Sequence, residues 1–319
     1  MIRARGIALC LALSALAAAC SLFALASLRA AHAAPVSIQD DDGTAIALRE
    51  PARRIIALYG AFNEILLAMG LEDRIIARTA ADAEIPELAH LPGIGTHMRP
   101  SLEMVAALGP DLVLQMGGRD EALESAHALR RLGVTVAVFH VASFDELFSC
   151  ISRLGGLTGS EPEAARLVGA LETRLADLAA TLDLPVTGDA RPTVFFELRY
   201  PGLIGAGSGA MVTDIIDRAG GRNVLASPQS RERVVRLGEE ELLRLDPAVY
   251  LVQRGPMNKN PVPPGERPHY AALSAVREGR TFIVDERLFS RPGPRSVDAA
   301  EALARILHPH RFSDSGVSP

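Results

Sequence analysis

The segment Glu161 to Leu182, EPEAARLVGALETRLADLAATL, predicts one long helix around which the rest of the chain is arranged. It contains no glycine cluster and no proline beyond its first turn. Ser160 and Glu163 have the spacing of a capping box at its start. At about 1.5 Å per residue the helix would be about 33 Å long, roughly the diameter of a small domain. Its leucines recur at steps of three and four, which predicts one apolar face made of Leu167, Leu171, Leu175, Leu178 and Leu182.

The segments on either side of this helix resemble each other. Glu103 and Glu240 each stand seven residues before a proline, with a short helical pattern between them and a buried-strand run afterwards. Residues 54–77 and residues 202–226 both run from a strand through a small-residue loop into a helix that ends at a glycine. Two matched motifs in the same order predict an α/β protein with two Rossmann-like lobes joined by the single long helix.

The first 33 residues have the pattern of an export signal. Two arginines precede an apolar run, and Ala31-His32-Ala33 supplies a small-residue cleavage site. An uncleaved anchor, or a lipid at Cys20, is an alternative that also places the protein outside the cytoplasm. We therefore expect a signal peptide (1–33), a first α/β lobe (34–157), a connecting helix (158–184), a second α/β lobe (185–311) and a disordered tail (312–319).

Composition and motifs disfavour several classes of function. The net charge of -5 and the pI near 5.9 argue against a nucleic-acid partner. Cys150 is the only cysteine expected after processing, so neither an internal disulfide nor a thiolate metal cluster is predicted. The absence of G-x-S-x-G and H-E-x-x-H motifs disfavours a secreted hydrolase. The scattered histidines disfavour a receptor for free zinc or manganese, which needs three to four converging ligands.

Candidate ligand residues follow the predicted strands, where open α/β sheets place their ligand crevice. A glycine-flanked loop, residues 93–100, carries imidazole and thioether groups that can ligate iron and a guanidinium that can pair with carboxylates. Further arginines stand in the basic runs 230–236 and 287–295. The residues that we expect to bind the ligand are Tyr59, His97, Met98, Arg99, Arg119, Arg199, Tyr200, Arg254 and Arg295.

Several segments together resemble a known family. The run from Arg54 to Gln115 contains NEILLAMG, a Gly-Ile-Gly loop and PSLEMVAALGPDLVL, and is followed much later by LGEEELLRLDPAVYLV and GPRSVDAAEALARILHP. These segments resemble the periplasmic substrate-binding proteins of ABC importers for ferric siderophores, haem and vitamin B12. The resemblance implies the class III periplasmic binding protein fold, in which the ligand lies between two lobes. It also implies a periplasmic monomer without catalysis or a cofactor of its own, which delivers a small-molecule metal chelate to an inner-membrane permease dimer.

The resemblance assigns roles to further residues. Glu103 and Glu240 stand where this family carries the glutamates that dock on the permease. Haem-binding members commonly have a tyrosine ligand where this chain has Thr96, so His97 would have to serve as the iron ligand, or else Met98 or Tyr59. The chain has no tryptophan, which removes a common stacking surface for corrinoids and catecholates. The ligand thus stays open among a ferric siderophore, haem and cobalamin, with a free-cation receptor and a ligand-sensing signalling receptor as alternatives.

Overall fold

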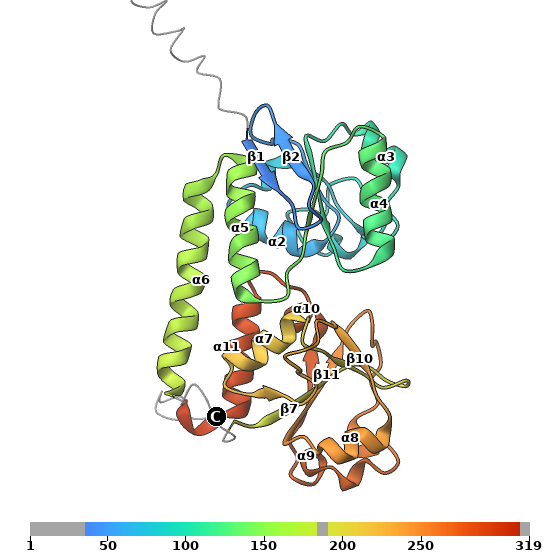
Figure 1. The fold of residues 1–319 in the computed structure, drawn as a ribbon, viewed down its shortest axis with the longest axis vertical. Coiled ribbons are helices and arrows are strands. Elements are labelled where there is room, and N and C mark those ends of the chain that lie inside the picture. The colour runs from blue at the N-terminus through green and yellow to red at the C-terminus, as the bar shows by residue number, and fades with distance from the viewer. Residues whose placement is uncertain (1–35, 184–190, 313–319) are drawn as a thin grey trace, which may run out of the picture.

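The computed structural model describes residues 36–183 and 191–312, which form two α/β lobes beside a long helix (Figure 1). The predicted signal peptide and the tail after Phe312 lie outside the described residues. Among the residues that are described, no helix is both long enough and apolar enough to cross a membrane.

The first lobe is built on a four-stranded parallel sheet. Its strands occur in the order β4 (Ile75–Ala77), β3 (Ile55–Ala57), β5 (Leu112–Met116) and β6 (Val136–Phe139). The Asp42-Gly43 turn between two short alternating runs predicts a β-hairpin over residues 38–48. This hairpin is present as the antiparallel pair β1 (Val36–Gln39) and β2 (Ala45–Leu48). The helices of this lobe are α2 (Gly60–Ala68), α3 (Leu102–Ala107), α4 (Asp120–Arg131) and α5 (Phe144–Thr158), with 3-10 turns η1 (Glu72–Arg74) and η2 (Ala80–Asp82).

The second lobe repeats this order of parallel strands. β9 (Arg222–Asn223), β7 (Thr193–Arg199), β11 (Val249–Arg254) and β12 (Thr281–Asp285) are parallel neighbours. Two antiparallel strands, β8 (Ile204–Ala206) and β10 (Val234–Arg236), extend the sheet beyond β7. Its helices are α7 (Met211–Arg218), α8 (Glu239–Leu245), α9 (Ser274–Arg277), α10 (Glu286–Phe289) and α11 (Ser296–Leu307), with 3-10 turns η3 (Pro264–Glu266), η4 (Tyr270–Ala272) and η5 (Pro309–Arg311).

Helix α6 (Glu161–Leu182) has the predicted bounds and runs alongside both lobes (Figure 1). It packs on α5 of the first lobe and on α7 and α11 of the second. Four of the five predicted stripe leucines are buried, and the fifth, Leu167, is partly buried against the same core. Arg174 on its polar side pairs with Asp298 and Glu301 of α11, at 2.6 and 2.8 Å. The predicted α/β architecture with one long connecting helix is therefore confirmed.

The predicted capping box at the start of α6 is wrong. Ser160 occupies the N-cap position, but its hydroxyl lies 3.5 Å from the Thr158 carbonyl oxygen and makes no capping bond. Gly159 ends α5 in the left-handed conformation at φ 62°, so the chain turns directly from one helix into the next. In this tight turn the Ser160 side chain is buried and faces back toward α5.

The sequence repeat also needs one correction. The resemblance between residues 202–226 and residues 54–77 predicts that β8 is the counterpart of β3. β8 runs antiparallel to β7, whereas β3 is parallel to both of its neighbours. The counterpart of β3 is therefore β7, and β8 with β10 is an addition specific to the second lobe.

The glycine-rich loop Gly205–Gly209 packs against the residues directly before β10. The run of small residues before a helix predicts a loop in which the backbone approaches a ligand or the other lobe. Instead, a Cβ on Gly207 would overlap the Glu232 carbonyl oxygen, and one on Gly209 would overlap that of Arg231. The amides of Gly207 and Gly209 donate to the carbonyl oxygens of Arg233 and Glu232, at 3.0 and 2.8 Å. These glycines thus allow close backbone packing within the second lobe.

Candidate functional site

Six side chains lie close together between the lobes, four of them from the first lobe and two from the second. We call them the inter-lobe cluster. Tyr59 and His97 contact each other edge to face, with 5.3 Å between ring centroids. Arg233 reaches from the second lobe to within 3.4 Å of the Gly117 carbonyl oxygen in the first. The cluster consists of Tyr59, His97, Arg119, His140, Arg233 and Arg291.

Tyr59 is the centre of this cluster. It is the extended N-cap residue of α2, two residues after the end of strand β3, and it is half-buried. Burial raises the pKa of its phenol, while the charges of Arg291, Arg233 and Arg119 act in the opposite direction. Guanidinium groups from both lobes therefore lie close enough to act on one hydroxyl group.

His97 is held beside Tyr59 by its own backbone. Its carbonyl oxygen accepts a hydrogen bond of 3.0 Å from the side-chain amide of Gln115, a buried residue of β5. Burial lowers the pKa of the imidazole, the charges of Arg119 and Arg291 lower it further, and Asp82 opposes them. The imidazole is therefore kept neutral near pH 7, which is the form that accepts hydrogen bonds and ligates metals.

The turn after β5 must be built from glycines. A Cβ on Gly117 would overlap the imidazole of His140, and one on Gly118 would lie 2.8 Å from Nη1 of Arg233. Gly118 also has a φ of +88°, in the region that side chains disfavour. The Gly117-Gly118 turn thus leaves room for an imidazole from one lobe and a guanidinium from the other.

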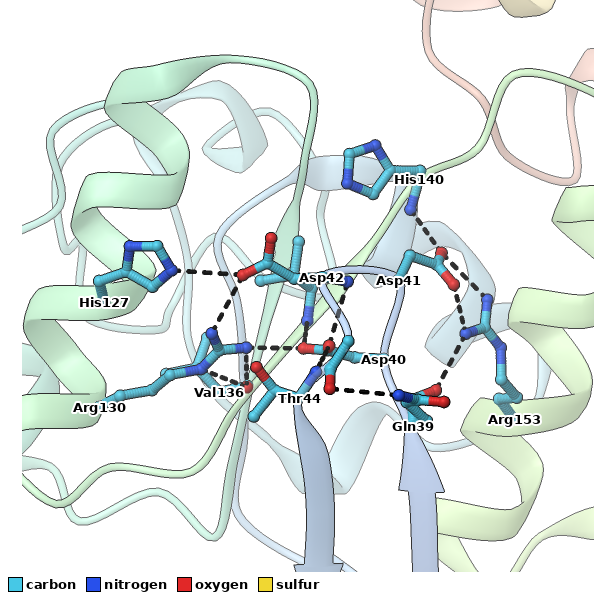
Figure 2. A network of polar contacts seen from close by, with 12 residues as sticks. Gln39, Asp40, Asp41, Asp42, Thr44, His127, Arg130, Val136, His140 and Arg153 are labelled. Carbon is cyan, nitrogen blue, oxygen red and sulfur yellow. Dashed lines mark hydrogen bonds and ion pairs between the residues drawn. The ribbon is translucent and has the colours of Figure 1, made fainter.

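The β1–β2 hairpin positions His140 (Figure 2). Its turn residue Asp41 accepts a hydrogen bond of 2.7 Å from the His140 backbone amide and pairs with Arg153 of α5 at 2.6 Å. The adjacent Asp40 accepts from the Val138 amide at 2.9 Å and pairs with Arg130 of α4 at 2.6 Å. The end of β6, from which His140 projects, is therefore tied to a polar network outside the sheet.

Arg295 lies in a different setting from the one that we expected. Its guanidinium crosses to the first lobe and binds Glu64 of α2, with Nη2 2.7 Å from Oε1. Arg291 binds the same carboxylate at 3.1 Å. On the α6 side of the molecule the lobes also meet where the Phe144 amide of α5 donates to Asp214 of α7 at 2.7 Å.

The remaining predicted ligand residues do not enter the cluster by any contact among the described residues. Met98 is half-buried, and its carbonyl oxygen accepts from Ser125 at 3.2 Å. Tyr200 packs inside the second lobe, where the Arg267 guanidinium lies 4.0 Å from its ring centroid. Arg99 and Arg199 are exposed, in the loop before α3 and at the end of β7.

Arg254 lines a separate hollow of the second lobe. A cavity of about 390 Å³ opens at the carboxyl ends of β11 and β12, between Arg254, Ile283 and Asp285. Arg287 on its rim pairs with Glu84 of the first lobe at 2.6 Å. The hollow therefore adjoins the surface along which the lobes meet.

The two glutamates expected to dock occupy equivalent positions. Glu103 is the second residue of α3 and Glu240 is the second residue of α8, and both are exposed. Each helix leads into the third parallel strand of its lobe, β5 or β11. Neither carboxylate has an ion-pair partner within residues 36–183 and 191–312.

Sequence reasoning missed Glu64, Asp82, His140, Arg233 and Arg291 as site residues. Glu64 could have been predicted from the sequence, because it is the sole charged residue of the apolar helix α2. Arg233 and Arg291 contact segments far away in the chain, and Asp82 and His140 join the site only through the packing of the folded chain, which a local pattern does not reveal. No group of three or more His, Cys, Asp or Glu side chains in the described part of the chain is placed to hold a metal ion.

Comparison with known sequences gives a consistent family match. Residues 55–288 match the model of the periplasmic binding protein family. An ABC transporter substrate-binding lipoprotein of Bacillus subtilis, itself uncharacterised, is 27% identical over 285 residues, which span 88% of this chain and 88% of the relative. The vitamin B12-binding protein of Vibrio cholerae is 24% identical over 257 residues, which span 81% of this chain and 90% of the relative.

Solved structures show the same fold. A structure of the ABC-type Fe3+-hydroxamate transport system of Saccharomonospora viridis superposes with a TM-score of 0.68 at 24% identity, covering 86% of this chain and 99% of its own. A periplasmic haem-binding protein of Pseudomonas aeruginosa superposes with a TM-score of 0.68 at 23% identity, covering 81% and 93%. The two lobes and α6 therefore form the class III periplasmic binding protein fold.

Proposed function

The chain belongs to the periplasmic binding protein family, and we propose that it captures an iron complex or a corrinoid in the periplasm and delivers it to an ABC importer. Family members are substrate-binding transport proteins and not enzymes. The names of the relatives and structural neighbours, which bind vitamin B12, haem or Fe3+-hydroxamate, support this range of ligands. The division into lobes at residues 157 and 185, the export signal and the monomeric state remain part of the proposal.

The inter-lobe cluster favours an anionic ligand. Arg119 and Arg233 have no carboxylate partner among the described residues, and both lie close enough to Tyr59 to influence its ionisation. Unpaired guanidinium groups on both walls of a ligand site bind carboxylates or other oxygen anions in a fork geometry. This observation carries the proposal that the ligand is a metal chelate with anionic groups, such as haem or a carboxylate-bearing ferric siderophore.

Cobalamin remains the second candidate. The likeness to the vitamin B12-binding protein of Vibrio cholerae supports it. The cluster offers little for it, since a corrinoid presents mainly neutral amides and the largest aromatic surface beside the arginines is the ring of Tyr59. Charge and not stacking should therefore decide between the two ligand classes.

The test is to purify residues 34–319 and titrate the protein with haemin, several ferric siderophores and cobalamin. Loss of one charge-assisted hydrogen bond costs about 1.5–3 kcal/mol, so Arg119→Gln should weaken binding of the anionic chelate by roughly 10- to 150-fold. The matched control is Arg131→Gln at the exposed opposite end of α4, which should leave binding unchanged. Tighter binding of cobalamin, unaffected by Arg119→Gln, would contradict the anionic assignment.

Haem, if it is the ligand, gives a second readout. A Soret shift reports iron ligation, and His97→Ala should diminish this shift if the imidazole is the ligand. An unchanged shift in His97→Ala removes this residue from the iron site and leaves Tyr59 or Met98 as the donor.

Docking is proposed for Glu103 and Glu240. Carboxylates also stabilise the first turn of a helix, so a structural role is the competing explanation. Replacing both by alanine should abolish transport by a reconstituted importer while ligand affinity stays intact. A fall in ligand affinity in the double variant would contradict the docking role.

A further inference from the structure

Glu64 is the point at which the second lobe is fastened to the first beside the inter-lobe cluster. Its side chain is only 12% exposed. It accepts hydrogen bonds from Nη1 of Arg291 at 3.1 Å and from Nε and Nη2 of Arg295 at 3.1 and 2.7 Å. One carboxylate of the first lobe is thus shared by two guanidinium groups of the second.

Glycines on both sides make this close approach possible. A Cβ on Gly60, at the start of α2, would lie 2.8 Å from Nη1 of Arg291 and would overlap Oδ1 of Asp82. A Cβ on Gly293 would lie 3.3 Å from Oε2 of Glu64. Because backbone from each lobe faces the pair without a side chain, the guanidinium and carboxylate groups fit between α2 and the start of α11.

Arg291 also faces a second carboxylate. Its Nη1 lies 4.0 Å from Oδ1 of Asp82, which is fully buried. The other oxygen of Asp82 accepts from Thr79 at 2.6 Å and from Asn63 at 3.1 Å, whereas Oδ1 has no hydrogen-bond donor among the described residues. Arg291 therefore lies between Glu64, which binds it, and Asp82, whose free oxygen attracts it.

The same guanidinium belongs to the inter-lobe cluster. Its Nη1 lies beside Gly60, the residue that follows Tyr59, and its charge acts on both Tyr59 and His97. The place of Arg291 in the cluster and the spacing of the lobes thus depend on the same carboxylate. The third bridge on this side, Arg287 to Glu84, is much more exposed and contributes little in comparison.

We propose that Glu64 is a positioning residue of the ligand site, which fixes the separation of the lobes and the place of the Arg291 guanidinium beside Tyr59 and His97. The ligand contacts are those of the proposed function, on which this role rests. Glu64 itself does not need to touch the ligand. It acts through Arg291 and Arg295 of the opposite lobe.

The separation of the lobes is tested without ligand. Spin labels on Ala107→Cys in α3 and Ala271→Cys in η4, both exposed positions, report the distance between the lobes, and the native Cys150 is buried. Glu64→Gln should broaden this distance distribution. The matched control Glu72→Gln, an exposed carboxylate of the same lobe in η1, should leave it narrow. A distribution as narrow in folded Glu64→Gln as in the control overturns the proposal.

A second measurement must report where the Arg291 guanidinium lies, and it must not change if Glu64 only stabilises the fold. Glu64→Asp keeps the charge and shortens the side chain, so a shift of the His97 pKa, measured by NMR, reports a displaced guanidinium and not a lost charge. The groups that act on His97 are Arg119, Arg291 and Asp82. An unmoved His97 titration in Glu64→Asp overturns the positioning role.

Arg295→Gln keeps the test decisive if a Glu64 variant does not fold. Arg295 is 46% exposed, and its loss leaves Arg291 in place. This variant should broaden the distance between the lobes while the His97 titration stays close to that of the unmodified protein, and an unbroadened distribution contradicts the proposal. Because no ligand is present in these measurements, their failure is distinguishable from a failure of the proposed function.

Discussion

The buried ion pair between Glu197 and Arg267 allows a quantitative prediction. Glu197 of β7 is 0% exposed and Arg267 is 1% exposed. Two hydrogen bonds join them, Nη1 to Oε2 at 2.5 Å and Nη2 to Oε1 at 2.9 Å. The hydroxyl of Tyr250 donates to the same carboxylate at 2.6 Å, and Arg267 binds the Val262 carbonyl oxygen at 2.6 Å through Nη2. The pair thus fastens the proline-rich segment before Arg267 to the sheet of the second lobe.

Arg267→Met should lower the free energy of unfolding of the second lobe by about 3–5 kcal/mol, because it leaves the buried Glu197 carboxylate without its counter-charge. Urea unfolding followed by circular dichroism measures the loss, and hydrogen exchange of β7 and β11 assigns it to this lobe. Tyr200 would also lose the guanidinium that lies 4.0 Å from its ring centroid.

The control tests whether the loss of stability comes from burial of the ion pair or from breaking any ion pair. Arg244 and Glu241 on α8 form an ion pair of 2.5 Å at the surface, with side chains 71% and 46% exposed. Arg244→Met should therefore change the stability very little, since exposed pairs are screened by water. The double variant Glu197→Leu with Arg267→Met should recover more than half of the single-variant loss, because no unpaired charge remains. A loss below about 1 kcal/mol for Arg267→Met, or no recovery in the double variant, would refute the reasoning.

Three further predictions concern stability and reactivity. Burial alone would raise the pKa of Asp41, but the hydrogen bonds from Arg153 and the His140 amide lower it below its ordinary value. Asp41 therefore stabilises the fold above about pH 4, and this stabilisation is lost as the pH falls through the lowered pKa. Asp41→Asn should accordingly make the free energy of unfolding depend less on pH in the acid range. Gly207→Ala should destabilise the second lobe, because the added Cβ would overlap a backbone carbonyl group. Gly169→Ala should instead raise the free energy of unfolding by about 0.5–1 kcal/mol in urea unfolding, because Gly169 lies in the middle of α6 with open space around it and alanine favours the helix. Cys150 is buried and its thiol pKa is raised by burial, so it should react with a thiol reagent only in denaturant; reaction under native conditions would contradict its placement.

Local patterns predicted the parts of the fold that depend on local structure. The leucine periodicity predicted the helix α6 and its buried face, and the Asp-Gly turn predicted the β1–β2 hairpin. The direction of β8 could not be predicted, because a strand of alternating small and apolar residues has the same pattern whether it pairs parallel or antiparallel. The Ser160 cap failed for a related reason, since the turn between two packed helices and not the cap spacing decides where the hydroxyl points.

The candidate site also contains residues that local sequence patterns predict and residues that they do not. Tyr59 and Arg119 were predicted because they follow strands, and parallel strands bring their carboxyl ends to one edge of a sheet. His97 was predicted because it lies in the glycine-flanked loop of residues 93–100. Arg233 and Arg291 were noticed only as members of basic runs. Their roles depend on partners 116 and 227 residues away in the chain, a relation that only the packing of the two lobes creates.

The correspondence of the lobes gives the docking proposal its geometric basis. β5 and β11 are the third members of two sets of parallel strands with the same order, so the helices that lead into them occupy equivalent sites on the two lobes. A permease built from two equal halves would meet Glu103 and Glu240 in equivalent settings. The settings differ in one respect, because Glu103 is followed by the exposed Met104, whereas Glu240 is flanked by two further glutamates, of which Glu241 is bound by Arg244. The excess negative charge is thus on the second lobe, so the contact made by that lobe should be the more sensitive to salt.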